Sequence, residues 1–232
     1  MSTLVRAISV DLDDTLWPMR PVLIGAEAAL AAWLADHAPA TARLMGSDWR
    51  KRRRAELLGS HPDKAHDVTW LRLRLIGDAL AEAGEPQALA RPAFEAFYTA
   101  RQAVELYPDV RPVLQRWAGR YKIIAITNGN ADLHRIGLGG LFDLTIGAHD
   151  VGAAKPDPRI FAQASERAGV PPGQILHIGD DLERDIHGAR AAGMRAAWLR
   201  RPDLPEPAWP QGSPPDEPRF CGLHELDQTL TP

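Results

Sequence analysis

Cysteine is almost absent from this chain, because Cys221 is the one cysteine among 232 residues. A single thiol excludes an internal disulfide. Long apolar runs are missing as well, since no stretch approaches the ~20 residues that a membrane-spanning helix needs. Residues 1–14 place an acidic cluster soon after a few apolar residues, which is unlike a secretory signal. We therefore expect a cytoplasmic protein that has no membrane partner.

The chain also lacks an excess of charge of one sign. Its 27 Lys and Arg residues oppose 30 Asp and Glu residues, and the formal net charge is -3. Because this balance gives no strong positive field, we expect no nucleic-acid partner. One basic run, residues 50–54, would cover every face of a helix, which predicts a solvated surface.

Short apolar segments alternate with helical segments in much of the chain. The apolar, β-branched composition predicts buried strands at residues 4–10, 122–127, 144–147, 175–178 and 195–199. Helices are predicted between them, at residues 109–119, 158–169 and 183–193. This alternation is typical of an α/β fold with a doubly wound parallel sheet. A proline-rich stretch, residues 201–218, is predicted to be a loop.

Helix-forming residues dominate one long segment after the first strand. Breaks at residues 37–40, 59–64 and 84–87 divide this segment into about four helices, without a convincing strand. A small helical bundle is therefore predicted at residues 18–106. The predicted domains are a sheet domain, residues 1–17 plus 107–232, and this inserted bundle.

Polar clusters stand at or near the ends of several predicted strands. They are residues 11–15, 127–129, 155–156 and 179–181, with Asp185 close behind the last. Each cluster alone has an ordinary explanation as a helix cap, a turn or a solvated lysine. Open parallel sheets, however, bind ligands at the carboxyl ends of their strands. Four clusters in these positions therefore predict one shared site.

The acidic members of these clusters fit phosphate-ester hydrolysis. Asp11 and Asp180, on different strands, would repel each other unless a cation lay between them, and Mg2+ prefers carboxylate and phosphate oxygens. Asp11 is a candidate nucleophile that would form an aspartyl-phosphate. Asp13, two residues later, is a candidate general acid and base. Asp14 and Thr15 are expected to shape the following loop.

The remaining members supply hydrogen-bond donors and positive charge. Thr127 offers a hydroxyl and Asn128 an amide to the oxygens of a transferring phosphoryl group. Lys155 adds a cation where negative charge would gather. The sequence therefore predicts a Mg2+-dependent phosphatase that acts on a small phosphorylated metabolite.

In this order, the four clusters resemble the four motifs of the haloacid dehalogenase superfamily, and the resemblance covers nearly the whole chain. It implies a Rossmann-like core with an inserted helical cap of the C1 type. It also implies that Asp11 is nucleophile and metal ligand, that Asp13 binds the metal through its backbone carbonyl, and that Asp180 is the third protein ligand. Asp185 matches the second acidic position of the last motif, and Asp181 is an adjacent alternative; a direct or a water-mediated metal contact stays open for both.

Four stretches carry a narrower resemblance: residues 11–22, 66–84, 127–143 and 177–199. They are similar to bacterial phosphatases of this superfamily that act on flavin mononucleotide and on 5-amino-6-(5-phospho-D-ribitylamino)uracil, in riboflavin synthesis. This resemblance implies such a substrate. A promiscuous phosphatase for sugar phosphates and nucleotides is the alternative.

Three residues are candidates for facing the substrate, namely Trp17, Arg20 and Trp70. An indole could stack on a flavin or pyrimidine ring, although core packing is the ordinary role of a tryptophan. His177, on a predicted strand, is expected to be a packed core residue.

Two rival functions share parts of this pattern. A hydrolytic dehalogenase would use Asp11 at carbon, but it needs neither a metal nor an acid, so Asp13 and Asp180 argue against it. A non-catalytic receiver-like phosphorylation switch also combines acidic residues, a threonine and a lysine on a doubly wound sheet. The Asp-x-Asp spacing and the long helical insertion favour the phosphatase. Both a monomer and a homodimer remain open.

Overall fold

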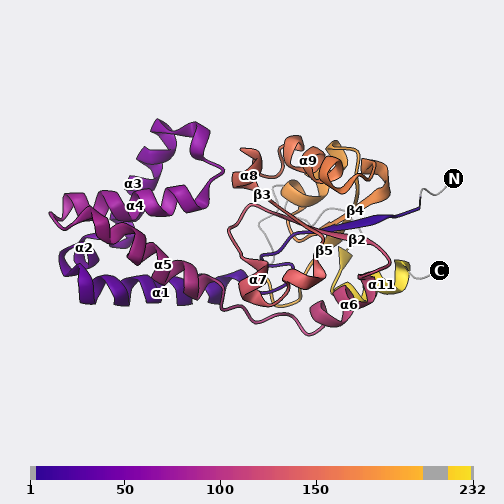
Figure 1. Ribbon diagram of the computed structural model, residues 1–232, viewed down its shortest axis with the longest axis horizontal. Helices are drawn as coiled ribbons and strands as arrows, with labels where there is room; N and C mark the ends of the chain where they lie inside the picture. Colours follow the sequence, from indigo (N-terminus) through magenta and orange to yellow (C-terminus); the bar gives the residue numbers. More distant parts are fainter. Residues whose placement is uncertain (1–3, 206–218, 231–232) are drawn as a thin grey trace. The chain divides into compact units, whose positions relative to one another are not determined.

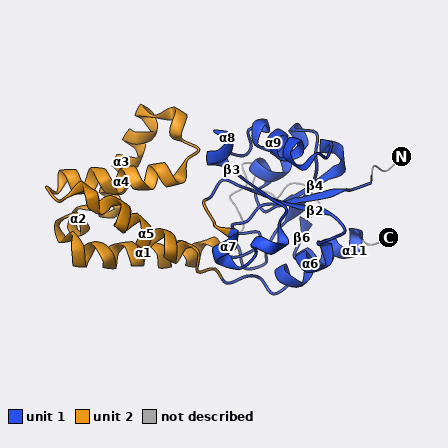
Figure 2. Cartoon of the chain, in the orientation of Figure 1, with its two compact units in different colours: residues 1–18, 105–129, 133–232 blue, residues 19–104, 130–132 orange. Residues whose placement is uncertain are grey.

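The computed structural model describes residues 4–205 and 219–230 of the chain. The chain forms two compact units, which Figures 1 and 2 show. Unit 1 comprises residues 1–18, 105–129 and 133–232, and unit 2 comprises residues 19–104 and 130–132. Most of the predicted proline-rich loop, residues 206–218, lies outside the described residues. Among the described residues, no helix is both long and apolar enough to span a membrane.

Unit 1 is built on a parallel sheet, which has six strands in the part of the chain that is described. The strand order is β3-β2-β1-β4-β5-β6. The strands are β1 (Ala7–Val10), β2 (Lys122–Thr127), β3 (Leu144–Gly147), β4 (Ile175–Gly179), β5 (Arg195–Leu199) and β6 (Arg219–Phe220). The order reverses at β1, which lies between β2 and β4, and such a switch point is where open α/β sheets bind ligands. The predicted α/β class with a doubly wound sheet is confirmed.

Helices cover both faces of this sheet. Figure 1 shows α8 and α9 on one side and α6 and α11 on the other. The helices of unit 1 are α6 (Val110–Trp117), α7 (Leu133–Ile136), α8 (Ala148–Val151), α9 (Pro158–Ala168), α10 (Gly188–Ala191) and α11 (Leu223–Leu230), the 3-10 turns η3 (Gly139–Leu141) and η4 (Pro172–Gln174), and the π-helix η5 (Leu182–His187). Because both faces are covered, β1 and β4 are buried along their whole length, which explains their mainly apolar sequences; Ser9 and His177 are their polar members.

Helix α9 illustrates how the local sequence sets an element. The Asp157 carboxylate accepts a hydrogen bond from the Arg159 backbone N–H at 2.9 Å, and Pro158 occupies the first turn. Gly169 ends the helix with φ 63°, a left-handed conformation that glycine adopts without strain. The buried side chains of Ile160 and Phe161 then pack in one cluster with the strand residues of β2.

Unit 2 consists of helices joined by turns and short loops in its described residues. Its helices are α1 (Met19–His37), α2 (Pro39–Leu44), α3 (Ser47–Ser60), α4 (Val68–Glu82) and α5 (Ala90–Arg101), with 3-10 turns η1 (Pro62–Lys64) and η2 (Gln87–Leu89). The predicted helical segments coincide with α1, α3, α4 and α5, whereas α2 was not expected. Leu30, Ile76 and Phe97 belong to its buried apolar cluster.

Segment 130–132 belongs to unit 2, although it is distant in sequence from the helices. The Asn130 side-chain amide donates to Thr69 Oγ1 at 3.0 Å, and the Asp132 backbone N–H donates to Gln102 Oε1 at 2.7 Å. This segment directly follows residues 127–129, one of the predicted phosphate-binding clusters. Local sequence patterns did not indicate that it joins the helical unit.

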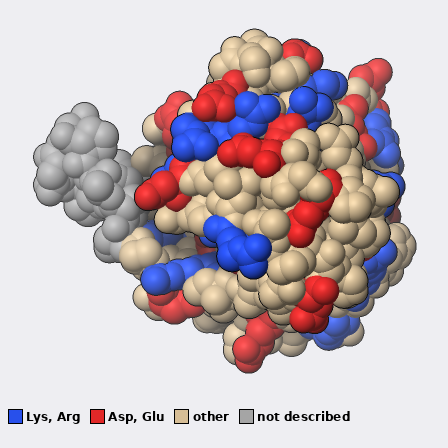
Figure 3. Space-filling model, turned by 90° about the vertical axis from the view of Figure 1, so that its left-hand side faces the viewer, with Lys and Arg blue, Asp and Glu red and all other residues tan. Residues whose placement is uncertain are grey.

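The basic run of α3 is engaged in ion pairs on the surface of unit 2. Arg50 lies 2.6 Å from Glu27, and Arg53 lies 2.8 Å from both Glu56 and Asp78. Figure 3 shows acidic and basic side chains interspersed over the face that it presents. Pairing of this kind fits a solvated surface better than a binding patch for a polyanion.

Candidate active site

The loop from Asp11 to Trp17 begins where β1 ends. The Asp11 backbone N–H donates to the Ile178 carbonyl at 2.9 Å, which fixes Asp11 against β4. Asp14 has a positive φ of 61°, and its backbone N–H donates to the Trp17 carbonyl at 2.8 Å. Aspartate tolerates this left-handed conformation better than most residues, so its place at this bend has a local reason. Asp14 therefore shapes the loop as expected from the sequence.

Lys155 joins two of the predicted acidic residues in the interior of unit 1. Its Nζ lies 2.5 Å from Asp11 Oδ1 and 2.6 Å from Asp185 Oδ1, and all three side chains are buried. Burial disfavours the charged lysine, but the two neighbouring carboxylates outweigh it and raise the pKa of Lys155. Burial likewise opposes ionisation of Asp185, but Lys155 and His177 together more than compensate through their charge and hydrogen bonds, so the pKa of Asp185 is lowered. The positively charged ammonium group of Lys155 is thus held beside Asp11, the predicted nucleophile.

Asn128 holds the backbone that carries this lysine. Its Nδ2 donates to the Lys155 carbonyl at 3.0 Å, and its Oδ1 accepts from the Lys155 N–H at 2.7 Å. The amide that the sequence assigned to phosphoryl oxygens is therefore engaged with Lys155 in this structure. Thr127 is buried, and its Oγ1 accepts from the Gly129 N–H at 2.9 Å, which leaves its hydroxyl hydrogen available for donation.

Three carboxylates form an acidic cluster next to Lys155. Oxygens of Asp11, Asp180 and Asp185 lie within 4.8 Å of one another. Thr15 Oγ1 lies 3.4 Å from Asp11 Oδ2 and 3.4 Å from Asp180 Oδ1. Burial is the main cause that raises the pKa of both Asp11 and Asp180, and the charge of Asp11 raises that of Asp180 further. Carboxylate oxygens that are this crowded, two of them buried and that of Asp180 partly buried, fit a hard divalent cation such as Mg2+, which would relieve their repulsion.

The two acidic neighbours of Asp180 differ in what they do. Asp181 caps the helix η5, since its Oδ1 accepts from the backbone N–H groups of Glu183 and Arg184 at 3.0 and 2.8 Å. Asp185 instead points into the cluster and anchors Lys155. Sequence spacing left these two roles open, and the geometry separates them.

Gly179 makes room for this arrangement. A Cβ atom at this position would lie 2.2 Å from Asp185 Cγ, which is much closer than Cβ atoms approach non-bonded neighbours in folded proteins. On the next strand, Trp198 donates its indole N–H to the Asp180 carbonyl at 2.8 Å and so holds the backbone of the last motif. The sequence did not single out Trp198.

Asp13 pairs with Trp17 inside the first loop. The Trp17 indole N–H donates to Asp13 Oδ1 at 2.9 Å, and the Trp17 side chain has no exposed surface. This placement favours a role in orienting Asp13 over stacking on a ligand. In unit 2, Arg20 lies exposed in the first turn of α1, while Trp70 is partly buried and packs against the apolar cluster, beside His61.

Two buried groups near the site were not identified as functional from the sequence. His177 is buried as expected, but it also contacts Asp185 Oδ1 at 3.2 Å. Arg201 Nε donates to the Thr15 carbonyl at 3.0 Å, and Arg201 Nη1 lies 2.9 and 2.8 Å from the two Asp109 oxygens. His177 lies two residues before the last polar cluster, but a histidine on a buried strand predicts only core packing. Arg201 belongs to no recognised motif, and its partners Thr15 and Asp109 are 186 and 92 positions away. Local sequence patterns therefore carried no signal for them.

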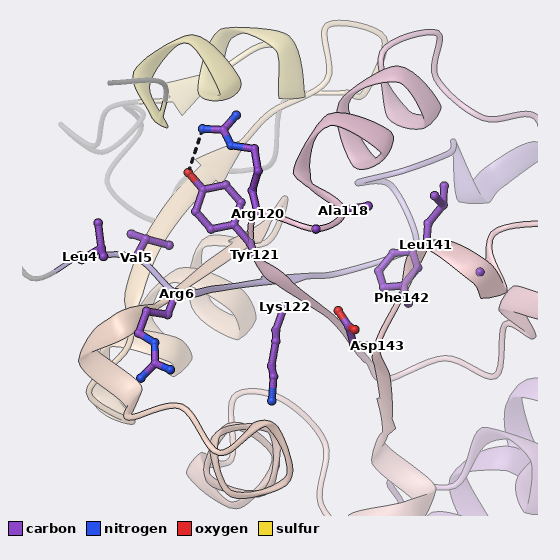
Figure 4. Close-up of a pocket in the computed structure, with 12 residues that line it drawn as sticks. Leu4, Val5, Arg6, Ala118, Arg120, Tyr121, Lys122, Leu141, Phe142 and Asp143 are labelled. Atoms are coloured by element: carbon purple, nitrogen blue, oxygen red, sulfur yellow. Dashed lines mark hydrogen bonds between the residues drawn. The ribbon is translucent and has the colours of Figure 1, made fainter.

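A separate hollow lies at the opposite edge of the sheet, where the strands begin (Figure 4). It has a volume of about 630 Å³, and its lining includes Arg6, Arg120, Lys122 and Asp143. The predicted catalytic residues all follow the carboxyl ends of strands. The hollow is therefore not part of the candidate active site.

Comparison with known proteins agrees with this arrangement. A family model for haloacid dehalogenase-like hydrolases matches residues 5–193. The 5-amino-6-(5-phospho-D-ribitylamino)uracil phosphatase YigB of Escherichia coli K12 is 35% identical over 200 residues, which cover 84% of each chain. The glyceraldehyde 3-phosphate phosphatase of Methanopyrus kandleri is 31% identical over 208 residues, which cover 85% of each chain. Among solved structures, a 2-haloacid dehalogenase from Pseudomonas syringae pv. tomato DC3000 is 38% identical, with a TM-score of 0.89 and coverage of 98% of both chains.

A parallel α/β sheet with an acidic cluster and a lysine at its carboxyl edge defines the class of the protein, a Rossmann-like hydrolase. The chain belongs to the haloacid dehalogenase-like hydrolase family. The assignment to this superfamily and the expectation of an enzyme are thereby confirmed.

Proposed function

We propose that this protein is a Mg2+-dependent phosphatase that hydrolyses a small phosphorylated metabolite through an aspartyl-phosphate. The observation that carries this proposal is the buried group in which Lys155 Nζ lies 2.5 Å from Asp11 while Asp11 and Asp180 converge in one acidic cluster. Asp11, Asp180 and the backbone carbonyl of Asp13 would hold the metal. Bound Mg2+ would offset the negative charge of these carboxylates and of the phosphoryl oxygens.

In the first half of the reaction, an Asp11 carboxylate oxygen attacks phosphorus. A bond forms between that oxygen and phosphorus, and the bond from phosphorus to the ester oxygen breaks. Asp13 donates its proton to the departing oxygen, so the leaving group departs as an alcohol. The hydrogen bond from Trp17 to Asp13 Oδ1 supports this role, because it limits the orientations of the Asp13 carboxyl.

In the second half, water hydrolyses the aspartyl-phosphate. Asp13, now ionised, accepts a proton from a water molecule, whose oxygen attacks phosphorus. The bond from phosphorus to Asp11 breaks, inorganic phosphate leaves, and the Asp11 carboxylate is regenerated. Lys155 and the Thr127 hydroxyl stabilise the negative charge on the phosphoryl oxygens in both halves.

We propose that residues 18–106 act as the cap that selects the leaving group, with residues 1–17 and 107–232 as the catalytic domain. The proposed substrate is 5-amino-6-(5-phospho-D-ribitylamino)uracil or flavin mononucleotide. The similarity to the E. coli ribitylaminouracil phosphatase over most of both chains supports this choice. The similarity to a glyceraldehyde 3-phosphate phosphatase supports the alternative of a broader specificity.

A second candidate function is hydrolytic dehalogenation, which the similarity to the P. syringae 2-haloacid dehalogenase favours. In that reaction Asp11 would attack carbon and displace halide, which needs no proton and no metal. Asp13, which accepts a hydrogen bond from Trp17, and Asp180, which lies in the acidic cluster with Asp11, would have no role in such a reaction. They therefore favour phosphoryl transfer.

The test measures phosphate release from a generic phosphomonoester, with and without Mg2+, and halide release from 2-chloropropionate. We expect Mg2+-dependent phosphate release by the wild type, none by Asp11→Asn, and near wild-type release by Asp181→Asn, whose carboxylate caps η5. Halide release without phosphate release would establish the dehalogenase. Stable phosphorylation without turnover would instead indicate a receiver-like switch.

A panel of phosphorylated substrates then tests the specificity. We expect the highest kcat/KM on the ribitylaminouracil phosphate or flavin mononucleotide, compared with sugar phosphates and nucleotides. Equal, slow rates on all of them would support the promiscuous phosphatase instead.

A further inference from the structure

Ser9 and His177 form a buried hydrogen bond behind the candidate site. They are register partners on the parallel strands β1 and β4, and both side chains are fully buried. Ser9 Oγ lies 2.9 Å from His177 Nδ1. Because the strands carry Asp11 and Asp180 just beyond these positions, the bond ties together the two strands that deliver the acidic cluster.

The other ring nitrogen of His177 faces the site. His177 Nε2 lies 3.2 Å from Asp185 Oδ1. An ionised carboxylate can only accept, so Nε2 carries the hydrogen whichever charge the imidazole has. The Ser9 hydroxyl can either donate or accept, so it satisfies Nδ1 in both cases. The direction of the contact from His177 to Asp185 is therefore fixed by chemistry.

Asp185 transmits this contact to Lys155. Its Oδ1 also accepts from Lys155 Nζ at 2.6 Å, and its Oδ2 accepts from the Asp181 backbone N–H at 3.1 Å. The His177 ring itself is held edge-on against Phe161, with ring centroids 5.2 Å apart. Asp185 thus has three donors in fixed places, and one of them is His177.

We propose that His177 is a positioning residue, which orients the Asp185 carboxylate and through it places Lys155 Nζ at the spot where a phosphoryl oxygen is bound. This inference rests on the proposed phosphatase function. A histidine with only a packing role would fill the same volume, but it would not need an N–H group directed at Asp185, the carboxylate that binds Lys155. His177 touches no reacting atom, so its effect passes entirely through Asp185 and Lys155.

The experiment compares three full-length variants with the wild type in saturating Mg2+. His177→Leu removes the donor and keeps an apolar side chain. His177→Gln keeps an N–H group that can reach Asp185. Ser9→Ala removes the hydroxyl on the far side of the ring. Each is measured for its thermal unfolding midpoint, for kcat and KM on a generic phosphomonoester, and for inhibition by inorganic phosphate.

We expect His177→Leu to lower kcat/KM by about 10- to 100-fold at temperatures where it stays folded, as supporting residues of charged sites commonly do. The inhibition constant for inorganic phosphate should rise in parallel, because Lys155 Nζ would no longer be held where it contacts a phosphate oxygen. His177→Gln should restore both quantities to within about threefold of the wild type, and Ser9→Ala should shift both slightly in the same direction as His177→Leu.

Several outcomes would overturn the proposal. One is a folded His177→Leu with the rate and phosphate inhibition of the wild type. Another is an equal loss in His177→Leu and His177→Gln that follows their thermal stability, since that pattern indicates packing alone.

A crystal structure of His177→Leu separates this inference from the proposed function. Displacement of Lys155 Nζ from Asp185 supports the positioning role, and an unchanged Lys155 refutes it, whatever the activity. A wild type that releases no phosphate would refute the phosphatase instead.

Discussion

The indole N–H of Trp17 donates to Oδ1 of Asp13 across 2.9 Å, within a loop that starts at the proposed nucleophile. The same two residues form an isolated backbone bridge, and Trp17 is fully buried. A catalytic acid on a short loop would otherwise sample several rotamers. The buried tryptophan therefore limits the orientations of the carboxyl group of Asp13, the proposed general acid.

Replacing this indole should slow the chemical step. Trp17→Phe keeps most of the buried ring but removes the N–H, and one such hydrogen bond contributes about 1 kcal/mol, or about fivefold in rate. We expect kcat to fall about fivefold with little change in KM, measured by phosphate release. Trp33→Phe, in the helical unit, is the matched control and should leave kcat unchanged. A normal kcat in Trp17→Phe would show that Asp13 needs no such support.

Mg2+ should stabilise the folded protein through Asp180. A ligand at about 100 times its dissociation constant adds about 2.7 kcal/mol to the free energy of unfolding. We expect the thermal midpoint of the wild type to rise with Mg2+ and that of Asp180→Asn to rise much less. Asp181→Asn removes an adjacent carboxylate that caps η5, so it should respond to Mg2+ as the wild type does.

Without Mg2+, Asp180→Asn should be at least as stable as the wild type, because burial raises the pKa of Asp180 and the charged form is disfavoured there. An equal rise of the thermal midpoint with Mg2+ in Asp180→Asn and Asp181→Asn would contradict the proposed metal site.

The ion pair between Arg201 and Asp109 should make stability depend on pH. Burial raises the pKa of Asp109, but Arg201 outweighs it and the pKa is lowered from its ordinary value of 3.8. A carboxyl with a lower pKa in the folded state stabilises the fold above its ordinary pKa, and this contribution disappears as the pH falls through the folded value. Asp109→Asn should therefore cost about 2 kcal/mol at pH 7 and progressively less below pH 3.8.

Urea unfolding of the wild type and Asp109→Asn at several pH values measures this difference. Asp157→Asn is a suitable comparison, because its partner Arg159 is exposed and surface pairs contribute little. A difference between wild type and Asp109→Asn that stays constant down to low pH would rule out the ion pair as its cause.

A methyl group at Gly179 should disable the site. The added Cβ would occupy the position of the Asp185 carboxylate, so Asp185 would have to leave Lys155. We expect Gly179→Ala to lower kcat/KM by at least about 100-fold, in line with the loss of a catalytic charge. Gly173→Ala is the control, because a Cβ there meets nothing within 4 Å. Normal activity in Gly179→Ala would mean that Asp185 is dispensable.

Much of the sheet could be predicted because the amino-acid sequence of each short segment is enough to identify it as a strand. Lys122–Thr127, Leu144–Gly147 and Arg195–Leu199 are short apolar runs whose predicted bounds match the structure. Strand Arg219–Phe220 and the helix after it were missed, because a two-residue strand has no periodicity to detect. Ligand sites of open parallel sheets lie at the carboxyl ends of the strands, and this rule correctly predicts that Asp11 and Asp180 lie close together.

The residues that support the site could not be predicted in this way. The bond between Ser9 and His177 depends on which strands are neighbours and on their register, and the two residues are 168 positions apart. Arg201 and Asp109 are 92 positions apart and meet only after the sheet has formed. Such contacts follow from topology, which a single sequence specifies only through the complete fold.

Segment 130–132 limits how freely evolution or an engineer can exchange the helical insertion. Deleting residues 19–104 and joining residue 18 to residue 105 would leave Asn130 and Asp132 without Thr69 and Gln102, their present partners. A transplanted helical bundle from a relative would have to supply equivalent acceptors, or the chain just after Thr127 would be remodelled. The helical insertion consequently cannot be exchanged by itself, and chimeras should be built with residues 19–104 and 130–132 exchanged together.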